Sequence, residues 1–262
     1  MNQDILHKKG YRIKLGDVDV TGQLKPGALF SLFQDVASEA ADRIGYGYEY
    51  LRKTYDAAWI LVRLHFEAIR FPKYNEQVLL ETWPLLPDRF EYPRDFLLKN
   101  EKGEVLIRAR SFWAILHIQT RKMMRADRLN LPNLSEPPGQ PEAVDRPRLT
   151  DFGHLQPVWK IRVGISETDI NGHLNNAKYV DYMMDCFSME EYRNWKVRTL
   201  DIQFVHETFS GETVELYRDL SRIGEGVLYI EGKKSPEGQR VFKGLVRVEK
   251  RLTPQPHPFT GK

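Results

Sequence analysis

The sequence has a single cysteine, Cys186, among its 262 residues. One cysteine excludes both an intramolecular disulfide and a cysteine-based zinc cluster. Cys186 falls on the apolar face of a predicted helix, which favours a small buried hydrophobe over a nucleophile. The seven histidines show no metal-ligand spacing. The sequence therefore predicts neither a metal nor a cofactor.

Long hydrophobic runs are also absent. The sequence has no stretch of about 18 apolar residues, the length that a helix needs to cross a membrane. The segment from Met1 to Lys9 lacks the apolar core of a signal peptide and the Arg- and Ser-rich character of a transit peptide. A formal net charge of +3 is too small to argue for nucleic acid. We expect a cytoplasmic protein that binds neither membrane nor nucleic acid.

What is present is an ordinary globular balance of 41% hydrophobic and 29% charged residues. The first half reads as one helix and a meander of strands. Pro26 suits the first turn of the helix, and Gly45 and Gly47 end it. A half-buried strand follows from Ile60 to Ile69, and further strands are expected at 77–83, 94–99 and 104–118. The pattern indicates an α+β unit.

The second half repeats the first. Trp159 to Gly164 echoes Tyr11 to Gly16, and Asp169 to Leu174 echoes Asp19 to Leu24. Segment 200–214 aligns without gaps on 64–78, which places Glu207 opposite Phe71. Prolines and polar residues between the halves indicate a linker at 128–156, so we expect units at 1–127 and 157–262. Each unit would leave sheet edges that the other can pair with, as in a fused pseudo-dimer.

One polar stretch stands out within the repeat. Asp169, Asn171 and His173 are spaced i, i+2 and i+4, and in an extended segment they would share one face. They precede a predicted helix that Asn175 or Asn176 can cap, where free N–H groups favour an oxyanion. A polar loop with a helix cap explains these residues equally well.

Two sets of segments carry a family resemblance. In the first half they are Trp59 to Leu64, Glu81 to Pro84, Ser111 to Trp113 and Thr120 to Lys122. In the second half, Asp169 to Tyr179 has the pattern Asp-x-Asn-x-His-x-Asn-Asn-x-Lys-Tyr. These segments resemble the acyl-acyl-carrier-protein thioesterase family and its signature, in a bacterial-type form. The resemblance implies a double hot-dog fold, in which each of two units wraps a curved antiparallel sheet around a long helix.

By this resemblance Asp169, Asn171, His173 and Glu207 match catalytic positions. Thioester hydrolysis needs an activated water, a stabilised oxyanion and a proton near the departing thiolate. We assign Glu207 as general base, Asn171 as the group that positions water or carbonyl, and His173 as polariser or proton donor. Asp169 either orients this set or is itself the base. Thr208 follows Glu207 where plant members commonly have cysteine, which argues against a Cys-His mechanism.

The implied substrate has an acyl chain and an acidic carrier protein. An apolar slot in the first unit suits the chain, with plain core packing as the alternative. Basic residues after that unit would steer the carrier, with a solvated charge run as the alternative. The slot residues are Leu29, Phe33, Trp59, Ile60 and Val62, and the docking residues are Arg121, Lys122, Arg125 and Arg128.

The resulting hypothesis is hydrolysis of fatty acyl-acyl carrier protein to free fatty acid and carrier protein, ending fatty acid synthesis. An acyl-CoA thioesterase of the same fold and a non-catalytic acyl-thioester binding module remain alternatives. Pseudo-dimers could associate further into a homodimer. Because the first unit has Thr21, Gln23 and Phe71 where the second has Asn171, His173 and Glu207, we expect one active site, in the second unit.

Overall fold

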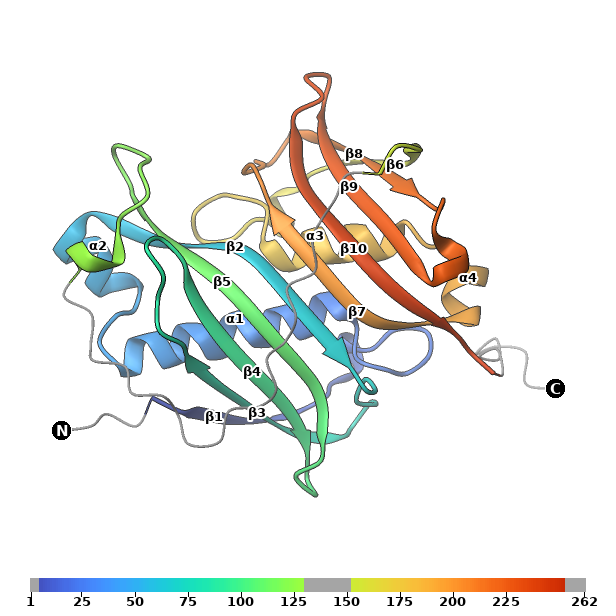
Figure 1. The fold of residues 1–262 in the computed structure, drawn as a ribbon, viewed down its shortest axis with the longest axis horizontal. Coiled ribbons are helices and arrows are strands. Elements are labelled where there is room, and N and C mark those ends of the chain that lie inside the picture. Colours follow the sequence, from blue (N-terminus) through green and yellow to red (C-terminus); the bar gives the residue numbers. More distant parts are fainter. Residues whose placement is uncertain (1–4, 130–151, 253–262) are drawn as a thin grey trace.

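A computed structural model describes residues 5–129 and 152–252 of the chain. Its strands form one antiparallel sheet of ten, in the order β1-β3-β4-β5-β2-β7-β10-β9-β8-β6, with helices α1 and α3 against one face (Figure 1). This confirms the predicted α+β class. The strands are β1 His7–Arg12, β2 Ala57–Ala68, β3 Gln77–Pro84, β4 Tyr92–Asn100, β5 Val105–His117, β6 Gln156–Arg162, β7 Trp195–Phe204, β8 Thr213–Asp219, β9 Val227–Ser235 and β10 Arg240–Lys250.

The strand order repeats between the halves, since 1-3-4-5-2 of the first unit corresponds to 6-8-9-10-7 of the second. The two five-stranded halves join where β2 pairs antiparallel with β7. In that register Leu64 faces Ile202 and Phe66 faces Leu200, so these two pairs are related by a pseudo-twofold axis that passes through the equivalent residues His65 and Asp201. One edge of each half, β2 or β7, is thus paired with the other half, as a fused pseudo-dimer requires.

Helix α1, Pro26–Arg43, begins at the predicted proline and is followed by Gly45 in a left-handed conformation, with φ of 81°. Its counterpart α3, Asn176–Asp185, begins as predicted at a cap, because the Asn175 side chain accepts a hydrogen bond from the Ala177 N–H at 2.9 Å. Two short helices were not predicted: α2, Tyr48–Tyr55, and α4, Met189–Asn194. A capping box at Ser188 and Glu191 was the missed signal for α4.

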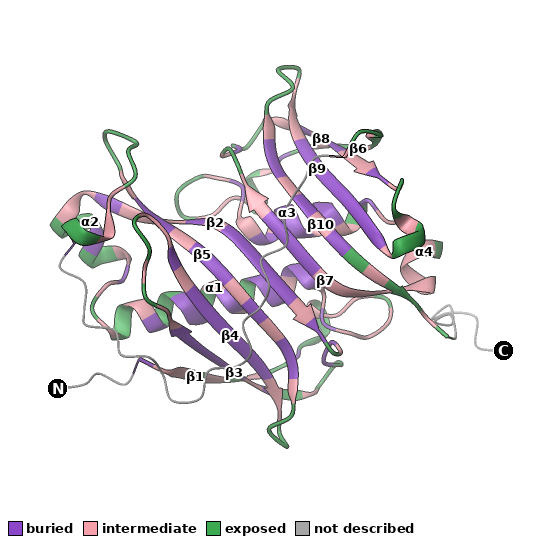
Figure 2. Cartoon of the chain, in the orientation of Figure 1, coloured by how far each residue is buried: buried purple, intermediate pink, exposed green. Residues whose placement is uncertain are grey.

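One hydrophobic core runs through both units, and Figure 2 shows the buried residues as bands along the central strands. Phe33 and Phe66 of the first unit belong to the same cluster as Tyr179 and Phe242 of the second. Cys186 is buried in this cluster, and burial raises the pKa of its thiol to about 12. That environment matches the expected structural role of Cys186. None of the helices in residues 5–129 and 152–252 is long and apolar enough to cross a membrane.

Most of the expected linker, 128–156, lies outside the described residues. Its ends are ordered parts of the fold. Arg128 closes a short 3-10 helix that starts at Ala126, and Leu129 is buried. At the other end, Gln156 already belongs to β6.

The expectation of a half-buried strand at β2 was wrong for residues 63–66, which are buried on both faces. Arg63 and His65 occupy the face opposite the helices. The guanidinium of Arg63 donates two hydrogen bonds of 2.8 Å to Asp201, and His65 Nδ1 lies 3.2 Å from the same carboxylate. The central place of β2 in the ten-stranded sheet accounts for this burial. The buried charge of Arg63 is tolerated because Asp201 on β7 supplies the opposite charge.

Candidate functional site

The stretch from Asp169 to His173 is a tight turn, so the expected extended arrangement was wrong. The Asp169 carboxylate accepts hydrogen bonds from the backbone N–H of Asn171 at 2.8 Å and of His173 at 3.2 Å. Gly172 takes φ of 77°, which glycine adopts at little cost. The chain turns here because a short carboxylate satisfies backbone donors two and four residues ahead.

The first unit repeats this turn. Asp19 accepts from the N–H of Thr21 at 2.7 Å and of Gln23 at 3.3 Å, and Gly22 has φ of 72°. An aspartate is therefore kept at the turn even where imidazole and glutamate are absent. Of the two roles left open for Asp169, this favours orientation of the site over proton abstraction.

His173 and Glu207 face each other across the turn. His173 Nε2 lies 3.6 Å from Glu207 Oε2, with a quarter of the His173 side chain and a third of the Glu207 side chain exposed. The His173 ring meets the edge of Phe209 with ring centroids 4.9 Å apart. The backbone holds the pair in place, since His173 bridges to Phe209 and the Leu174 N–H donates to the Thr208 carbonyl at 2.7 Å.

Arg121 completes this group from the other unit. Its guanidinium donates to the Glu207 carboxylate at 2.6 Å, across 86 residues of sequence. Arg121 lies in the turn after β5 with φ of 55°. Of the other expected docking residues, Arg125 pairs with Asp127, while Lys122 and Arg128 are exposed. Sequence reasoning placed Arg121 on a docking surface, and the structure places it against the candidate base.

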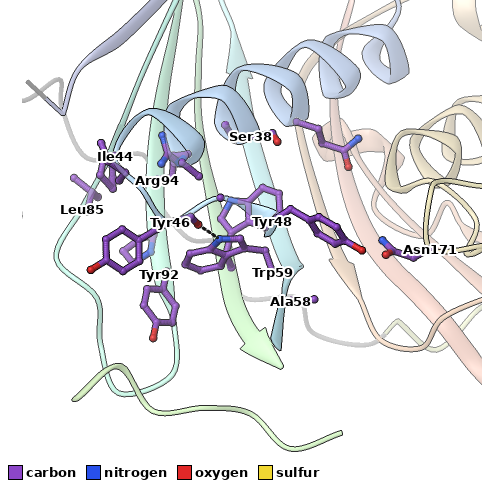
Figure 3. Close-up of a pocket in the computed structure, with 17 residues that line it drawn as sticks. Ser38, Ile44, Tyr46, Tyr48, Ala58, Trp59, Leu85, Tyr92, Arg94 and Asn171 are labelled. Carbon is purple, nitrogen blue, oxygen red and sulfur yellow. Dashed lines mark hydrogen bonds between the residues drawn. The ribbon is translucent and has the colours of Figure 1, made fainter. Parts of the chain in front are cut away.

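Two pockets meet at this group. The outer pocket has a volume of about 470 Å³ and is lined by Arg121, Asn171, His173 and Glu207, among others. The inner pocket, of about 200 Å³, is lined mainly by the first unit, from α1 and strands β2, β3, β4 and β5, and by Asn171 of the second unit (Figure 3). Both pockets include Tyr48, Ala58, Trp59 and Asn171. Asn171 is thus the one member of the polar set that faces both.

The inner pocket is mostly apolar and well ordered by its own contacts. The Trp59 indole donates to the Tyr46 carbonyl at 2.8 Å and packs edge-on against Tyr92, with ring centroids 5.0 Å apart. Figure 3 shows Asn171 at one end of the lining and Ile44 and Leu85 at the other. The lining residues are Gln34, Ala37, Ser38, Ala41, Ile44, Tyr46, Gly47, Tyr48, Ala58, Trp59, Pro84, Leu85, Tyr92, Pro93, Arg94, Trp113 and Asn171.

Only some of the residues expected to form the acyl slot line one of these two pockets. Trp59 lines both pockets, and Ile60 lines only the outer one. Leu29 and Phe33 are fully buried in the core and line neither pocket, and Val62 lines neither. Leu29 and Phe33 lie on the side of α1 that packs into the core, whereas a different side of the same helix lines the pocket.

Arg94 of the inner pocket was also missed as a site residue. It follows Tyr92 and precedes Phe96 and Leu98 at alternate positions of β4, and Phe96 and Leu98 belong to the core. An arginine in an otherwise apolar alternation was the available signal. Within the described ranges, no group of three or more His, Cys, Asp or Glu side chains is arranged to hold a metal ion.

Chemically, the arrangement joins a carboxylate, an imidazole, an amide and a guanidinium at the mouth of an apolar cavity. A carboxylate near an imidazole can take a proton from water and pass a proton to a leaving group. The amide of Asn171 can donate to a carbonyl oxygen. The apolar cavity suits an alkyl chain attached to that carbonyl.

Comparison with known families matches both halves of the chain. A model of the acyl-ACP thioesterase N-terminal domain matches residues 4–128, and one of the acyl-ACP thioesterase C-terminal domain matches residues 156–242. Oleoyl-acyl carrier protein thioesterase 2 of Arabidopsis thaliana, a chloroplastic protein, is 24% identical over 220 residues, which are 77% of this chain and 60% of that protein. The corresponding protein of Coriandrum sativum is 22% identical over 231 residues, or 80% and 61%. The chain thus spans about three fifths of these relatives.

Two solved structures are similar over nearly their full length. An acyl-ACP thioesterase from Bacteroides thetaiotaomicron superposes with a TM-score of 0.83 at 26% identity, covering 94% of this chain and 99% of that one. A 12:0-ACP thioesterase from Umbellularia californica gives a TM-score of 0.75 at 17% identity, covering 95% and 99%. The second similarity concerns the fold alone.

Proposed function

Because the chain belongs to the acyl-ACP thioesterase family, we propose that it hydrolyses fatty acyl-acyl carrier protein to a free fatty acid and the carrier protein. The observation that carries the proposal is the position of Asn171, which lines both the apolar inner pocket and the polar outer pocket. A thioester whose alkyl chain fills the inner pocket has its carbonyl at this junction. Its sulfur and the carrier-bound arm then lie in the outer pocket.

In this proposal Glu207 accepts a proton from the attacking water. The water oxygen bonds to the carbonyl carbon, and the carbonyl oxygen takes up negative charge that the Asn171 amide stabilises. Collapse of this intermediate breaks the carbon–sulfur bond, and His173 delivers a proton to the departing thiolate. The proton that Glu207 took from water then passes to His173, whose Nε2 lies 3.6 Å from Glu207 Oε2, and both groups are restored. Arg121 holds the Glu207 carboxylate through their 2.6 Å contact, and Asp169 holds the turn that carries Asn171 and His173.

The carrier is proposed to dock through exposed cations in the segment that follows β5. Lys122 directly follows Arg121 in the turn after β5, and Arg128 ends the 3-10 helix Ala126–Arg128. The side chains of Lys122 and Arg128 are both exposed. An acidic carrier would be attracted to these charges, most strongly at low ionic strength.

The test is an assay of thiol release from acyl-carrier-protein and acyl-CoA substrates of matched, graded chain length. We expect faster turnover of the carrier-bound substrates. Lys122→Glu and Arg128→Glu should each raise KM for them by up to about fivefold, the usual range for an exposed charge pair, and leave the CoA substrates unchanged. Lys102→Glu, in the exposed turn between β4 and β5 at the other end of β5, is the matched control.

Two results would count against the proposal. No hydrolysis of either substrate class by a folded protein would refute the thioesterase activity. Equal rates on both classes, with no effect of the two charge reversals, would refute carrier docking and favour an acyl-CoA thioesterase.

A further inference from the structure

Among the described residues that line the inner pocket, one side chain is ionised, that of Arg94 on β4. Only 7% of Arg94 is exposed, and it lies among the apolar lining residues near Ile44 and Leu85 (Figure 3). Such a position usually holds an apolar side chain, because burying an unpaired charge is costly. The buried Arg94 guanidinium therefore needs interactions that offset the cost of its burial.

The partners of Arg94 are few. Its Nη1 donates to the Thr82 hydroxyl oxygen at 3.2 Å, and the Thr82 hydroxyl itself donates to the Asp95 carbonyl at 2.9 Å. The Asp95 carboxylate belongs to the other face of β4, where it pairs with Arg110 at 2.6 Å. Among the described residues no carboxylate forms an ion pair with Arg94, and Thr82 is the one acceptor of a hydrogen bond from its guanidinium. Most of its five N–H donors therefore have no acceptor in the described part of the protein.

Burial lowers the pKa of Arg94 to about 10, and no neighbouring charge offsets that effect. The guanidinium is still cationic at neutral pH. Thr82 alone therefore does not balance the charge, and the pocket can accept an oxygen atom from a ligand at this point.

The position of Arg94 lies far from the reacting end. Figure 3 shows Asn171 at one end of the lining and Arg94 toward the end that also holds Ile44 and Leu85. Arg94 pairs with Pro84 between β4 and β3, directly before Leu85. The lining follows α1 from Gln34 to Ile44, the residue that caps the helix, over ten residues or about 15 Å at a helical rise of about 1.5 Å per residue. An extended chain covers about 1.2 Å per bond, as a polypeptide does, so about 12 bonds separate the two ends.

We propose that Arg94 is a subsite for an oxygen atom on the distal part of the acyl chain, which makes acyl chains with a distal hydroxyl, oxo or carboxylate group the preferred substrates. The inference rests on the proposed thioesterase function, because that function puts an acyl chain in the inner pocket. A plain alkyl chain would leave the Arg94 donors unsatisfied and dry, whereas an oxygen acceptor would satisfy them.

The experiment compares octanoyl, decanoyl and dodecanoyl thioesters of the carrier protein in three forms: unsubstituted, with a terminal hydroxyl, and with a terminal carboxylate. At one length or more, we expect the wild-type kcat/KM to favour an oxygenated chain over the plain chain by about tenfold to a hundredfold, as for hydrogen bonds to charged groups. The hydroxyl and carboxylate arms distinguish a neutral acceptor from an anion.

Arg94→Met should reverse this ratio, by slowing the oxygenated substrate and accelerating the plain one. Arg94→Gln is the second variant, which keeps a hydrogen-bond donor without the charge. Arg247→Met, which removes an exposed arginine of β10, is the matched control and should change neither rate. Thermal unfolding of each variant establishes that it is folded.

The inference is overturned if the plain chain is preferred at every length, or if Arg94→Met changes both members of each pair equally. If no thioester is hydrolysed, the proposed function fails, and calorimetric binding of the corresponding free acids to wild type and Arg94→Met still decides the inference. Tighter binding of the oxygenated acid by wild type alone supports the subsite, and equal binding refutes it.

Discussion

Glu207 contacts polar side chains of both units. Its carboxylate contacts Arg121 of the first unit at 2.6 Å and lies 3.6 Å from His173 of the second. At the equivalent place the first unit has Phe71, which is buried, and Gln23 in place of the histidine. Neither can take a proton from water or deliver one to a thiolate at neutral pH. The chemistry is therefore expected only at the second copy.

Single substitutions at this set test that expectation. Asn171→Ala, His173→Ala and Glu207→Gln should each lower kcat by about a hundredfold or more, which is the usual contribution of a general base or an oxyanion donor. The triple variant should be little slower than the slowest single one, because the groups act in one step. Steady-state kinetics with one acyl-carrier-protein substrate measures both effects.

Thr21→Ala and Gln23→Ala are the controls from the first unit, and both should retain most activity. Their turn is held by Asp19, which remains in place. If folded Gln23→Ala lost as much activity as His173→Ala, the assignment of the chemistry to the second unit would be contradicted.

Between elements, the contact of β10 with β7 and α3 depends on a glycine. A methyl group at Gly244 would lie 2.5 Å from the Asp201 carbonyl oxygen and 2.6 Å from Met183 Cε. Gly244 faces Ile202 on β7, and the equivalent position of the first unit, opposite Phe66 on β2, holds Ala109. The second unit therefore packs its helix and strand more closely here than a side chain allows.

Gly244→Ala should lower the free energy of unfolding by about 1–3 kcal/mol, as overpacking of a core does. Gly10→Ala is the matched control, since Gly10 also lies in a strand and a methyl group there would meet no atom within 4 Å. Urea denaturation compares the two. An unchanged stability of Gly244→Ala would mean that β10 can shift away from α3 at no cost.

At the scale of the whole molecule, the units are joined by the β2–β7 pair, a shared core and a buried charge cluster. Asp201 is 1% exposed and accepts two hydrogen bonds from Arg63 across the joint. Such a buried pair adds little net stability over apolar side chains of the same size. Removing one partner is much more costly, since the other charge stays buried.

Asp201→Ala should therefore lower the free energy of unfolding by about 3–5 kcal/mol. The double variant Arg63→Met, Asp201→Leu should recover much of that loss, because no charge of the pair is left behind. Chemical denaturation of the wild type and the two variants provides the comparison. A double variant less stable than Asp201→Ala would show that the pair itself stabilises the joint.

Much of this architecture follows from local patterns along the chain. The apolar spacing of α1, its first-turn proline, the Asn175 cap and the repeated halves are local patterns, so they predicted two α+β units and the polar stretch before α3. The residues Asn171, His173 and Glu207 could be named in the same way, through the repeat and the family signature. Local patterns did not reveal that Asp169 closes a turn, because the alternation of polar residues looks the same in a strand.

Only the tertiary structure decided which distant side chains meet. Arg121 lies 86 residues from Glu207, and the two come together because the turn after β5 lies beside the loop after β7 once the sheet is assembled. The pocket lining likewise combines α1, β2 and β4 with Asn171 of the second unit. Burial of Arg94 and pairing of Asp201 with Arg63 depend on the same assembly, since sequence spacing sets which face a residue takes but not what lies opposite it.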